Sequence, residues 1–169
     1  MTAIIYIMGV SGSGKTTIGK KLSRATGIPF FDADDFHSVA NKNKMSAGHP
    51  LNDEDRKEWL QNINQKAREE ATNKGAIIAC SALKEKYRTI LTAQIDRPVY
   101  WVFLQGDYQL IHERISDRKD HFMPAGLLQS QFEILEVPAG GLTIDISKSP
   151  EEIVAIILQQ LNLPVTTIS

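Results

Sequence analysis

Gly9-Val10-Ser11-Gly12-Ser13-Gly14-Lys15-Thr16 is the stretch of sequence that decides the fold. It follows an apolar run at residues 3–8, which predicts a buried strand, and it precedes residues 17–26, whose apolar side chains recur with helical spacing. The order of strand, glycine-rich loop and helix, with the spacing G-x-x-x-x-G-K-[ST], predicts a phosphate-binding loop rather than an ordinary turn rich in glycine and serine.

Each part of this motif has a physical role in binding a nucleoside triphosphate. The glycines let backbone N–H groups approach an anion closely, and the following helix adds the partial positive charge of its N-terminus. Lys15 is expected at the β- and γ-phosphates as a catalytic charge, and the hydroxyl of Thr16 is expected to bind the Mg²⁺ that bridges them. We therefore expect the loop and the adjoining Thr17 to bind the nucleotide.

The composition indicates one compact domain that spans residues 1–169. Of these residues 42% are hydrophobic, so the chain can bury a sizeable core but has no room for a second full domain. The net charge of −1 argues against a broad basic surface for nucleic acid or an anionic membrane, so we expect small-molecule partners. With a single cysteine, no signal peptide and no apolar run of membrane-spanning length, the sequence predicts a cytoplasmic protein.

Short apolar runs alternate with helical patterns along the rest of the chain. Further strands are predicted at residues 28–31, 76–80, 99–104 and 142–146, and helices at residues 53–73, 84–93, 108–118, 124–135 and 150–161. Four of these helices have candidate capping residues at their starts, which are Asp53, Ser81, Asp107 and Ser149, the last followed by Pro150. This alternation predicts an α/β fold of three layers, α/β/α, in which a five-stranded parallel sheet carries helices on both faces. Two polar stretches without a clear period, residues 37–52 and 119–126, indicate an acceptor-binding insertion at about 37–73 and a mobile lid at about 114–135.

Carboxylates follow the second predicted strand, at the sheet edge where open α/β folds bind ligands. A hydroxyl that attacks a γ-phosphate needs a group that orients it and accepts its proton, and Mg²⁺ needs oxygen ligands or hydrogen-bonded water. We assign the first task to Asp34 and the second to Asp32, because alternation along an extended strand would aim both side chains the same way. Asp35 is interpreted instead as the N-cap of a following helix.

Basic residues gather in three later segments. Arg56 lies in the first turn of a predicted helix, where the helix dipole disfavours a cation, so we expect it to meet an anion. Lys84 and Arg88 are four residues apart on one predicted helix face, where a carboxylate on the acceptor would neutralise both. Arg114 and Arg118 end another predicted helix; its dipole explains one of them, and together they are expected to bind ATP phosphates and act as catalytic charges.

The sequence closely resembles the gluconokinase family from the first strand to the last helix. The phosphate-binding loop alone is shared with many nucleotide-binding proteins, whereas the P-L-N-D-x-D-R and C-S-A-L-K blocks are characteristic of this family. Besides the loop, the matching blocks are Asp32-Ala33-Asp34-Asp35-Phe36-His37, Lys44-Met45, Pro50-Leu51-Asn52-Asp53-Glu54-Asp55-Arg56, Cys80-Ser81-Ala82-Leu83-Lys84, Tyr87-Arg88, His121-Phe122-Met123 and Leu128-Gln129-Ser130-Gln131-Phe132-Glu133.

The resemblance implies a homodimeric, Mg²⁺-dependent kinase that transfers the γ-phosphate of ATP to the 6-hydroxyl of D-gluconate. It also implies the strand order 2-3-1-4-5, as in the related shikimate and adenylate kinases. Beyond the loop, the residues that it places at the adenine are Ser147, Lys148 and Pro150. The residues that it assigns to gluconate are Asp34, His37, Lys44, Arg56, Lys84, Arg88 and His121.

Two other functions compete with this interpretation. The first is another small-molecule kinase, acting on shikimate or a nucleoside monophosphate, but the glycine-rich element that shikimate kinases use after the third strand is absent from the sequence. The second is a nucleotide-dependent switch, which needs a guanine-reading N-K-x-D element; the stretch Asn43-Lys44-Met45-Ser46 lacks the aspartate. Phosphate transfer to a small acceptor would separate an enzyme from a switch.

Overall fold

The computed structural model describes residues 2–117 and 125–166. In chain order the elements are β1 (Ile4–Met8), α1 (Lys15–Thr26), β2 (Phe30–Asp32), the 3₁₀ helix η1 (Ala33–Phe36), α2 (Val39–Ser46), α3 (Asp53–Ala71), β3 (Ala76–Ala79), α4 (Glu85–Thr92), β4 (Val99–Gln105), α5 (Tyr108–Ser116), α6 (Ala125–Ile134), β5 (Leu142–Asp145) and α7 (Pro150–Gln160). No helix within these ranges combines the length and the apolar character needed to cross a membrane.

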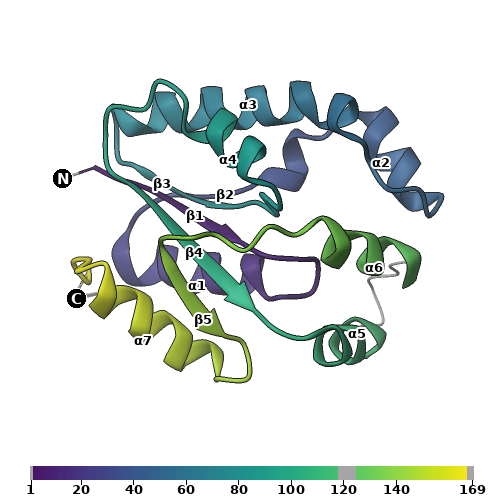
Figure 1. Ribbon diagram of the computed structural model, residues 1–169. Coiled ribbons are helices and arrows are strands. Elements are labelled where there is room, and N and C mark those ends of the chain that lie inside the picture. The colour runs from purple at the N-terminus through teal and green to yellow at the C-terminus, as the bar shows by residue number, and fades with distance from the viewer. Residues whose placement is uncertain (1, 118–124, 167–169) are drawn as a thin grey trace.

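Among the described residues, five strands form one parallel sheet in the order β2-β3-β1-β4-β5. This order confirms the prediction. Because all strands run the same way, their carboxyl ends meet at one edge, which lies on the right in Figure 1. The loops that follow the strands therefore gather there, and they carry the residues expected to bind nucleotide and acceptor.

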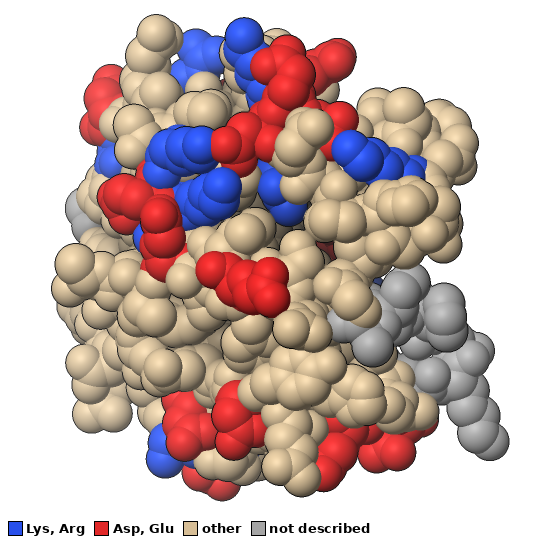
Figure 2. All heavy atoms as spheres, turned by 45° about the vertical axis from the view of Figure 1, so that its right-hand side comes forward, with Lys and Arg blue, Asp and Glu red and all other residues tan. Residues whose placement is uncertain are grey.

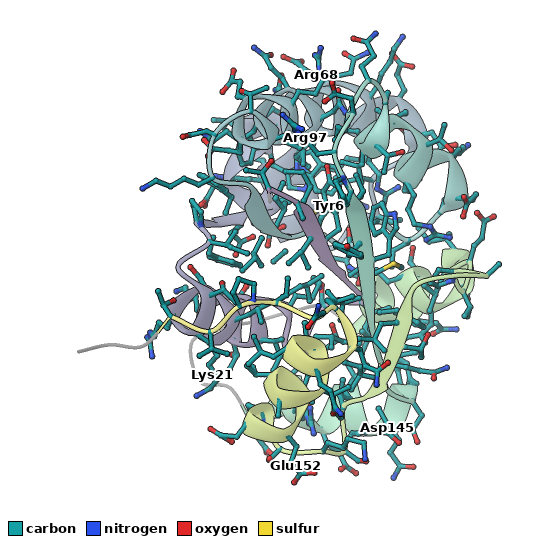
Figure 3. The ribbon with its side chains drawn as sticks, turned by 90° about the vertical axis from the view of Figure 1, so that its left-hand side faces the viewer. Tyr6, Lys21, Arg68, Arg97, Asp145 and Glu152 are labelled. Atoms are coloured by element: carbon teal, nitrogen blue, oxygen red, sulfur yellow. The ribbon has the colours of Figure 1, made fainter. Side chains whose placement is uncertain are left out.

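Helices cover both faces of the sheet and enclose two hydrophobic cores. Strand β1 supplies both cores, since its successive side chains point to opposite faces and every one of them is buried. Tyr6 belongs to the core beneath α3 and α4, where its hydroxyl donates to the carbonyl oxygen of Leu91 (Figure 3). Ile5 belongs to the core formed with α1 and α7 on the other face. Figure 1 shows the resulting three layers.

The structure corrects the predicted pattern in the polar stretch 37–52. Residues 39–46 form α2, which none of the predicted helix ranges covers, and the hydroxyl of Ser38, not Asp35, caps it by accepting from the backbone N–H of Asn41. The helix was missed because it is short and buries only Asn41, so it has no apolar stripe. Other helix starts agree with the sequence, since Asp107 caps α5, and Ser149 caps α7 with Pro150 at its first turn.

Candidate active site

The phosphate-binding loop joins β1 to α1 at the carboxyl edge of the sheet. Gly9 has a φ of 151°, and a Cβ there would lie 2.9 Å from the carbonyl oxygen of Leu104, so the loop can pass this point only with glycine. Val10 is buried, and the hydroxyl of Ser13 is the one buried side-chain polar atom without a hydrogen-bond partner in residues 2–117 and 125–166. Such groups are rare in folded proteins, and this one lies in a loop that the motif dedicates to a ligand.

Lys15 and the start of α1 bring positive charge to this loop. Gly14, the N-cap residue, adopts the left-handed conformation and has no side chain with which to cap the first turn. The helix thus presents backbone N–H groups toward the loop, as a phosphate-binding helix N-terminus does. The ammonium of Lys15 lies over the loop, donating to the carbonyl oxygens of Gly9 and Val10 at 3.0 Å each. Thr17 follows in the first turn of α1 as an exposed residue.

Thr16 and Asp32 form an oxygen pair that fits Mg²⁺. The hydroxyl of Thr16 donates to a carboxylate oxygen of Asp32 at 3.0 Å, and neighbouring ligands of an octahedral Mg²⁺ are also roughly 3 Å apart. Both residues line a hollow of about 440 Å³. Across the described residues, no three His, Cys, Asp or Glu side chains are grouped to hold a metal unaided; Mg²⁺ at nucleotide sites relies instead on phosphate and water oxygens.

Asp34 lies in η1, directly beyond β2. Its backbone N–H donates to Asp32 at 3.0 Å, so Asp32 is the N-cap of the 3₁₀ helix. Loss of solvent around Asp34 raises its carboxyl pKa, and the charge of Asp32 raises it further, whereas the Lys15 ammonium lowers it. Asp34 is therefore within electrostatic reach of the phosphate-binding lysine, and its raised pKa suits a group that accepts a proton.

Two details of the predicted carboxylate cluster are wrong. Strand β2 ends at Asp32, so strand alternation does not orient Asp34; the turn of η1 does. Asp35 lies inside η1 and caps no helix, because Asp32 caps η1 and Ser38 caps α2. These corrections remove the strand argument for the two aspartates. The metal role of Asp32 and the hydroxyl-orienting role of Asp34 stay predictions, supported by the hydrogen bond from Thr16 to Asp32 and by the charge of Lys15 near Asp34.

His37 is held against α3 as a partly buried ring. It stacks on Trp59, with ring centroids 4.1 Å apart, and the indole N–H of Trp59 donates to the carbonyl oxygen of Ala33 at 2.7 Å. Trp59 thereby fixes both ends of the segment that carries Asp34. Burial, with the charges of Arg56 and Lys42, lowers the pKa of His37 to about 4, so its imidazole is neutral near pH 7.

We expect His37 to make the folded state less stable as the pH falls from about 6.5 to 4. In this window the unfolded chain binds a proton on His37 that the folded chain excludes, so the free energy of unfolding falls with pH. The loss is on the order of 1–2 kcal/mol, below the full linkage value because solvent screens a partly buried ring. Urea unfolding of wild type and His37→Asn between pH 7 and 4.5 gives the free energy of unfolding at each pH. The loss appears as a difference between the two proteins in the slope of this free energy against pH. His49→Asn, at an exposed histidine, should follow wild type; equal slopes for His37→Asn and wild type would contradict the assignment.

Lys44 connects α2 to the start of α3. Its ammonium lies 2.6 Å from Asp55, which also completes a capping box with Asn52. The N-cap of α3 is therefore Asn52, one residue before the Asp53 that the sequence suggested. In this structure Lys44 orients α2 against α3, and its proposed contact with the acceptor stays a prediction.

Asp53 is the centre of a charged cluster above the sheet edge. It accepts hydrogen bonds from Lys84, at 3.3 Å, and from Lys86 and Tyr87. Lys86 first, then Tyr87 and Lys84, hold the pKa of Asp53 well below its usual range. Arg56 donates to the hydroxyl of Tyr87 at 3.0 Å. Figure 2 shows basic and acidic side chains interspersed over the upper part of the face that it presents.

Two ammonium groups contact the carboxylate of Asp53 in this cluster, and Arg56 joins the cluster through the hydroxyl of Tyr87. Arg56 meets the Tyr87 hydroxyl and the carbonyl oxygen of Leu51 instead of the predicted anion. Sequence reasoning assigned Arg56 and Lys84 but gave no role to Asp53, Lys86 or Tyr87, whose partners are more than 30 residues away in sequence. The cluster suits a small acceptor that carries a carboxylate and several hydroxyls.

Arg88 has a structural position rather than the predicted one. Helix α4 begins at Glu85, and Lys84 is extended, so Lys84 and Arg88 do not share a helix face. Arg88 is 4% exposed and donates to the carbonyl oxygens of Ala82 and Glu136 and to the carboxylate of Glu85. Because these groups occupy its guanidinium, we do not assign Arg88 to the acceptor. Nor does Ser81 cap α4, whose N-cap residue is Lys84.

The residues predicted to contact adenine lie in the loop between β5 and α7 and at the start of α7, and their contact with adenine stays a prediction. The turn of this loop is fixed by Asp145, which accepts from the backbone N–H of Ser147 at 2.8 Å, and Lys148 and Pro150 follow. Arg114 of α5 donates to the carbonyl oxygen of Ile146 at 2.7 Å, which ties it to this loop. Its predicted contact with the phosphates stays a prediction, and Arg118 and His121 lie outside the described residues.

Comparison with known proteins identifies relatives of two kinds. A family model described as shikimate kinase matches residues 11–162. A protein of Dictyostelium discoideum named as a probable gluconokinase is 47% identical, over 94% of this chain and 86% of its own length. The gluconokinase of Arabidopsis thaliana is 41% identical, over 94% of this chain and 92% of its own length.

Solved structures show the same relationship. A crystal structure of a gluconokinase from Sinorhizobium meliloti is 39% identical, has a TM-score of 0.86 and covers 95% of this chain and 91% of its own. Shikimate kinase from Aquifex aeolicus is 22% identical, with a TM-score of 0.61 and coverage of 94% and 95%, which demonstrates a shared fold.

Proposed function

This chain belongs to the gluconokinase family, and on that premise we propose that it transfers the γ-phosphate of ATP to the 6-hydroxyl of D-gluconate. The products are ADP and 6-phospho-D-gluconate. The observation that carries the proposal is the position of Asp32, which accepts one hydrogen bond from Thr16 of the nucleotide loop and one from the backbone of Asp34. One carboxylate thus connects the group that binds the nucleotide to the group assigned to the acceptor.

The chemical step follows from this arrangement. The phosphate-binding loop and Lys15 hold the triphosphate and neutralise charge that develops on the transferred group. Asp34 orients the attacking hydroxyl and accepts its proton as the new phosphate ester bond forms and the bond to ADP breaks. Thr16 and Asp32 would hold Mg²⁺, directly or through water, and the ion would supply charge neutralisation between the β- and γ-phosphates.

Acceptor recognition is assigned to the Asp53 cluster and the neighbouring His37. Lys84 and Arg56 offer charge-assisted hydrogen bonds to the carboxylate of gluconate. The lowered pKa of His37 keeps its ring uncharged. Because Nδ1 lies 3.4 Å from the side-chain amide nitrogen of Asn41 and accepts from it, Nε2 is the ring nitrogen that can donate to a hydroxyl group. The segment 37–73 therefore acts as the acceptor-binding insertion of this proposal.

Lys84→Met is expected to raise the KM for gluconate by about tenfold while leaving the KM for ATP unchanged. The variant keeps much of the length of the side chain but removes a charge-assisted hydrogen bond, worth roughly 1.5–3 kcal/mol in a binding site. Steady-state kinetics with each substrate varied in turn measures both constants. Lys74→Met, at an exposed lysine outside the site, is the matched control. An unchanged KM for gluconate would remove Lys84 from the acceptor site.

The test of the proposed function is an ADP-release assay with Mg²⁺–ATP and a panel of acceptors. The panel contains D-gluconate, shikimate, simple sugars and nucleoside monophosphates. We expect selective turnover with gluconate. The NMR spectrum of the product should show coupling of phosphorus to the protons on carbon 6. Turnover with another acceptor would overturn the substrate assignment, and no turnover with any of them would favour a nucleotide-binding switch.

A shikimate-type kinase is the second candidate, favoured by the family model that matches residues 11–162. Sequence identity argues against it, since proteins named as gluconokinases match at 37–47% but the shikimate kinase structure matches at 22%. The proposal further includes a cytoplasmic homodimer. Light scattering after size exclusion would measure the mass of the particle against the 18.8 kDa of one chain.

A further inference from the structure

We propose that Gln131 of α6 is a positioning residue of the phosphate-binding loop, which holds the loop at Ser11 in the conformation that binds a nucleoside triphosphate. The inference rests on the kinase function proposed above, but it does not depend on which acceptor is phosphorylated.

Two hydrogen bonds join Gln131 to Ser11. The backbone N–H of Ser11 donates to Oε1 of Gln131 at 2.7 Å, and Nε2 of Gln131 donates to the hydroxyl of Ser11 at 3.1 Å. The two residues are 120 positions apart in sequence, so the contact joins separate parts of the fold. Because one amide group engages two polar groups of one serine, the contact fixes the direction of the Ser11 backbone as well as its distance from α6.

The contact falls at a turn of the loop, where the backbone N–H of Ser13 donates to the carbonyl oxygen of Val10 at 3.2 Å. Ser11 lies between β1 and the N-terminus of α1, and the next residue, Gly12, has a φ of 79°. A Cβ at Gly12 would lie 2.7 Å from the side chain of Ile115 in α5. The loop is thus packed by α5 at Gly12 and hydrogen-bonded by α6 at Ser11, the two helices that Figure 1 shows beside it.

Helix α6 is itself fixed at its end, so it can hold the loop in place. Just beyond α6, Glu136 donates its backbone N–H to the carbonyl oxygen of Leu83 at 2.8 Å. Its carboxylate accepts from the backbone of Glu85 at 2.7 Å, and Arg88 donates to its carbonyl oxygen. Leu128, in α6, is buried in the core. The chain from Gln131 to Glu136 therefore connects the nucleotide loop to the segment between β3 and α4.

The side chain at this position must both donate and accept without bearing a charge. A glutamate would keep the acceptor for the Ser11 N–H but place a negative charge beside a loop that binds a polyanion. A methionine would have similar length but neither hydrogen bond. The two substitutions therefore separate the loss of the hydrogen bonds to Ser11 from the introduction of a charge.

The experiment compares Gln131→Met and Gln131→Glu with Gln129→Met and Gln129→Glu. Gln129 lies on the exposed face of the same helix and bonds to Glu133 within it. Calorimetry with Mg²⁺–AMPPNP and Mg²⁺–ADP gives nucleotide affinities, and kinetics gives kcat and KM for both substrates. Thermal unfolding checks that each variant is folded.

For Gln131→Met we expect about tenfold weaker binding of AMPPNP and a similar loss in kcat/KM for ATP, which is what two lost hydrogen bonds imply. The KM for the acceptor at saturating ATP should not change. Gln131→Glu should weaken AMPPNP binding more than ADP binding, because the added charge repels the more negative ligand more strongly. Both Gln129 variants should match wild type.

Three results would overturn the proposal. The first is an unchanged affinity of Gln131→Met for AMPPNP, and the second is an equal loss of AMPPNP affinity in the Gln129 variants. The third is an increase in the KM for the acceptor as large as that for ATP, which would indicate general destabilisation. The nucleotide-binding measurements do not use the acceptor. If no acceptor in the panel were phosphorylated but the binding data came out as expected, the assignment of gluconate would fail and that of Gln131 would stand.

Discussion

Lys15→Met is expected to lower kcat/KM by at least about 10³-fold while leaving the fold intact. The ammonium of Lys15 lies over the phosphate-binding loop, bonded to the carbonyl oxygens of Gly9 and Val10. In the proposed reaction it neutralises charge on the β- and γ-phosphates, where preorganised donors lower the barrier far more than they stabilise the ground state. Most of the loss should therefore appear in kcat, measured by ADP release with saturating ATP and gluconate.

Lys21→Met is the matched control for this variant. Lys21 is on the same helix, but its ammonium pairs with Glu151 of α7 on the protein surface (Figure 3), where an ion pair contributes little. Its kcat/KM should stay within twofold of wild type. If Lys15→Met retained more than a tenth of wild-type activity, the loop would not have the catalytic role assigned to it, whatever the acceptor.

The sequence predicted the sheet well, because its strands are buried on both faces. All five residues of β1 are buried, and a strand of this kind needs an uninterrupted apolar run, which is easy to recognise. The order of the strands could not be predicted from the apolar runs. Apolar runs do not say which strand lies beside which, so the order came from the family resemblance.

Local capping was predicted where one candidate residue stood alone and was mistaken where several competed. Asp107 and Ser149 cap their helices as predicted. In Asp32-Ala33-Asp34-Asp35 any aspartate can cap, and the structure selects Asp32 because β2 ends there. The start of α3 offers Asn52 and Asp53, and a reciprocal bond with Asp55 favours Asn52.

The least predictable features were the partners of polar side chains that come from distant segments. Arg88 was expected to bind an anion, but its guanidinium meets the carbonyl oxygen of Glu136, 48 residues away. Gln131 stands in a block that resembles the family, but the sequence gave it no role, because its partner Ser11 is 120 residues away. Such contacts depend on how helices pack on the sheet, which local pattern does not encode.

Asp34→Asn is expected to lower kcat by about 10²–10⁴-fold, the usual contribution of a general base. Asparagine has the same shape and keeps the backbone bond to Asp32, so η1 and the Mg²⁺ ligands should stay in place. The KM for ATP and the calorimetric affinity for Mg²⁺–AMPPNP should therefore change by less than about threefold, and the loss should be confined to kcat. Asp35→Asn removes a charge from the same 3₁₀ helix and should lower kcat by less than about tenfold.

The pH profile distinguishes a proton acceptor from a group that only shapes the site. Partial loss of solvent and the charge of Asp32 raise the pKa of Asp34 above its ordinary value, while the charge of Lys15 opposes the shift. Asp34 accepts a proton only when ionised, so wild-type kcat/KM should fall as the pH drops toward this raised pKa. Asp34→Asn should lose this acid limb and keep a low, flat rate. If kcat were unaffected, Asp32 would become the candidate base, because its carboxylate accepts from both Thr16 and the backbone N–H of Asp34.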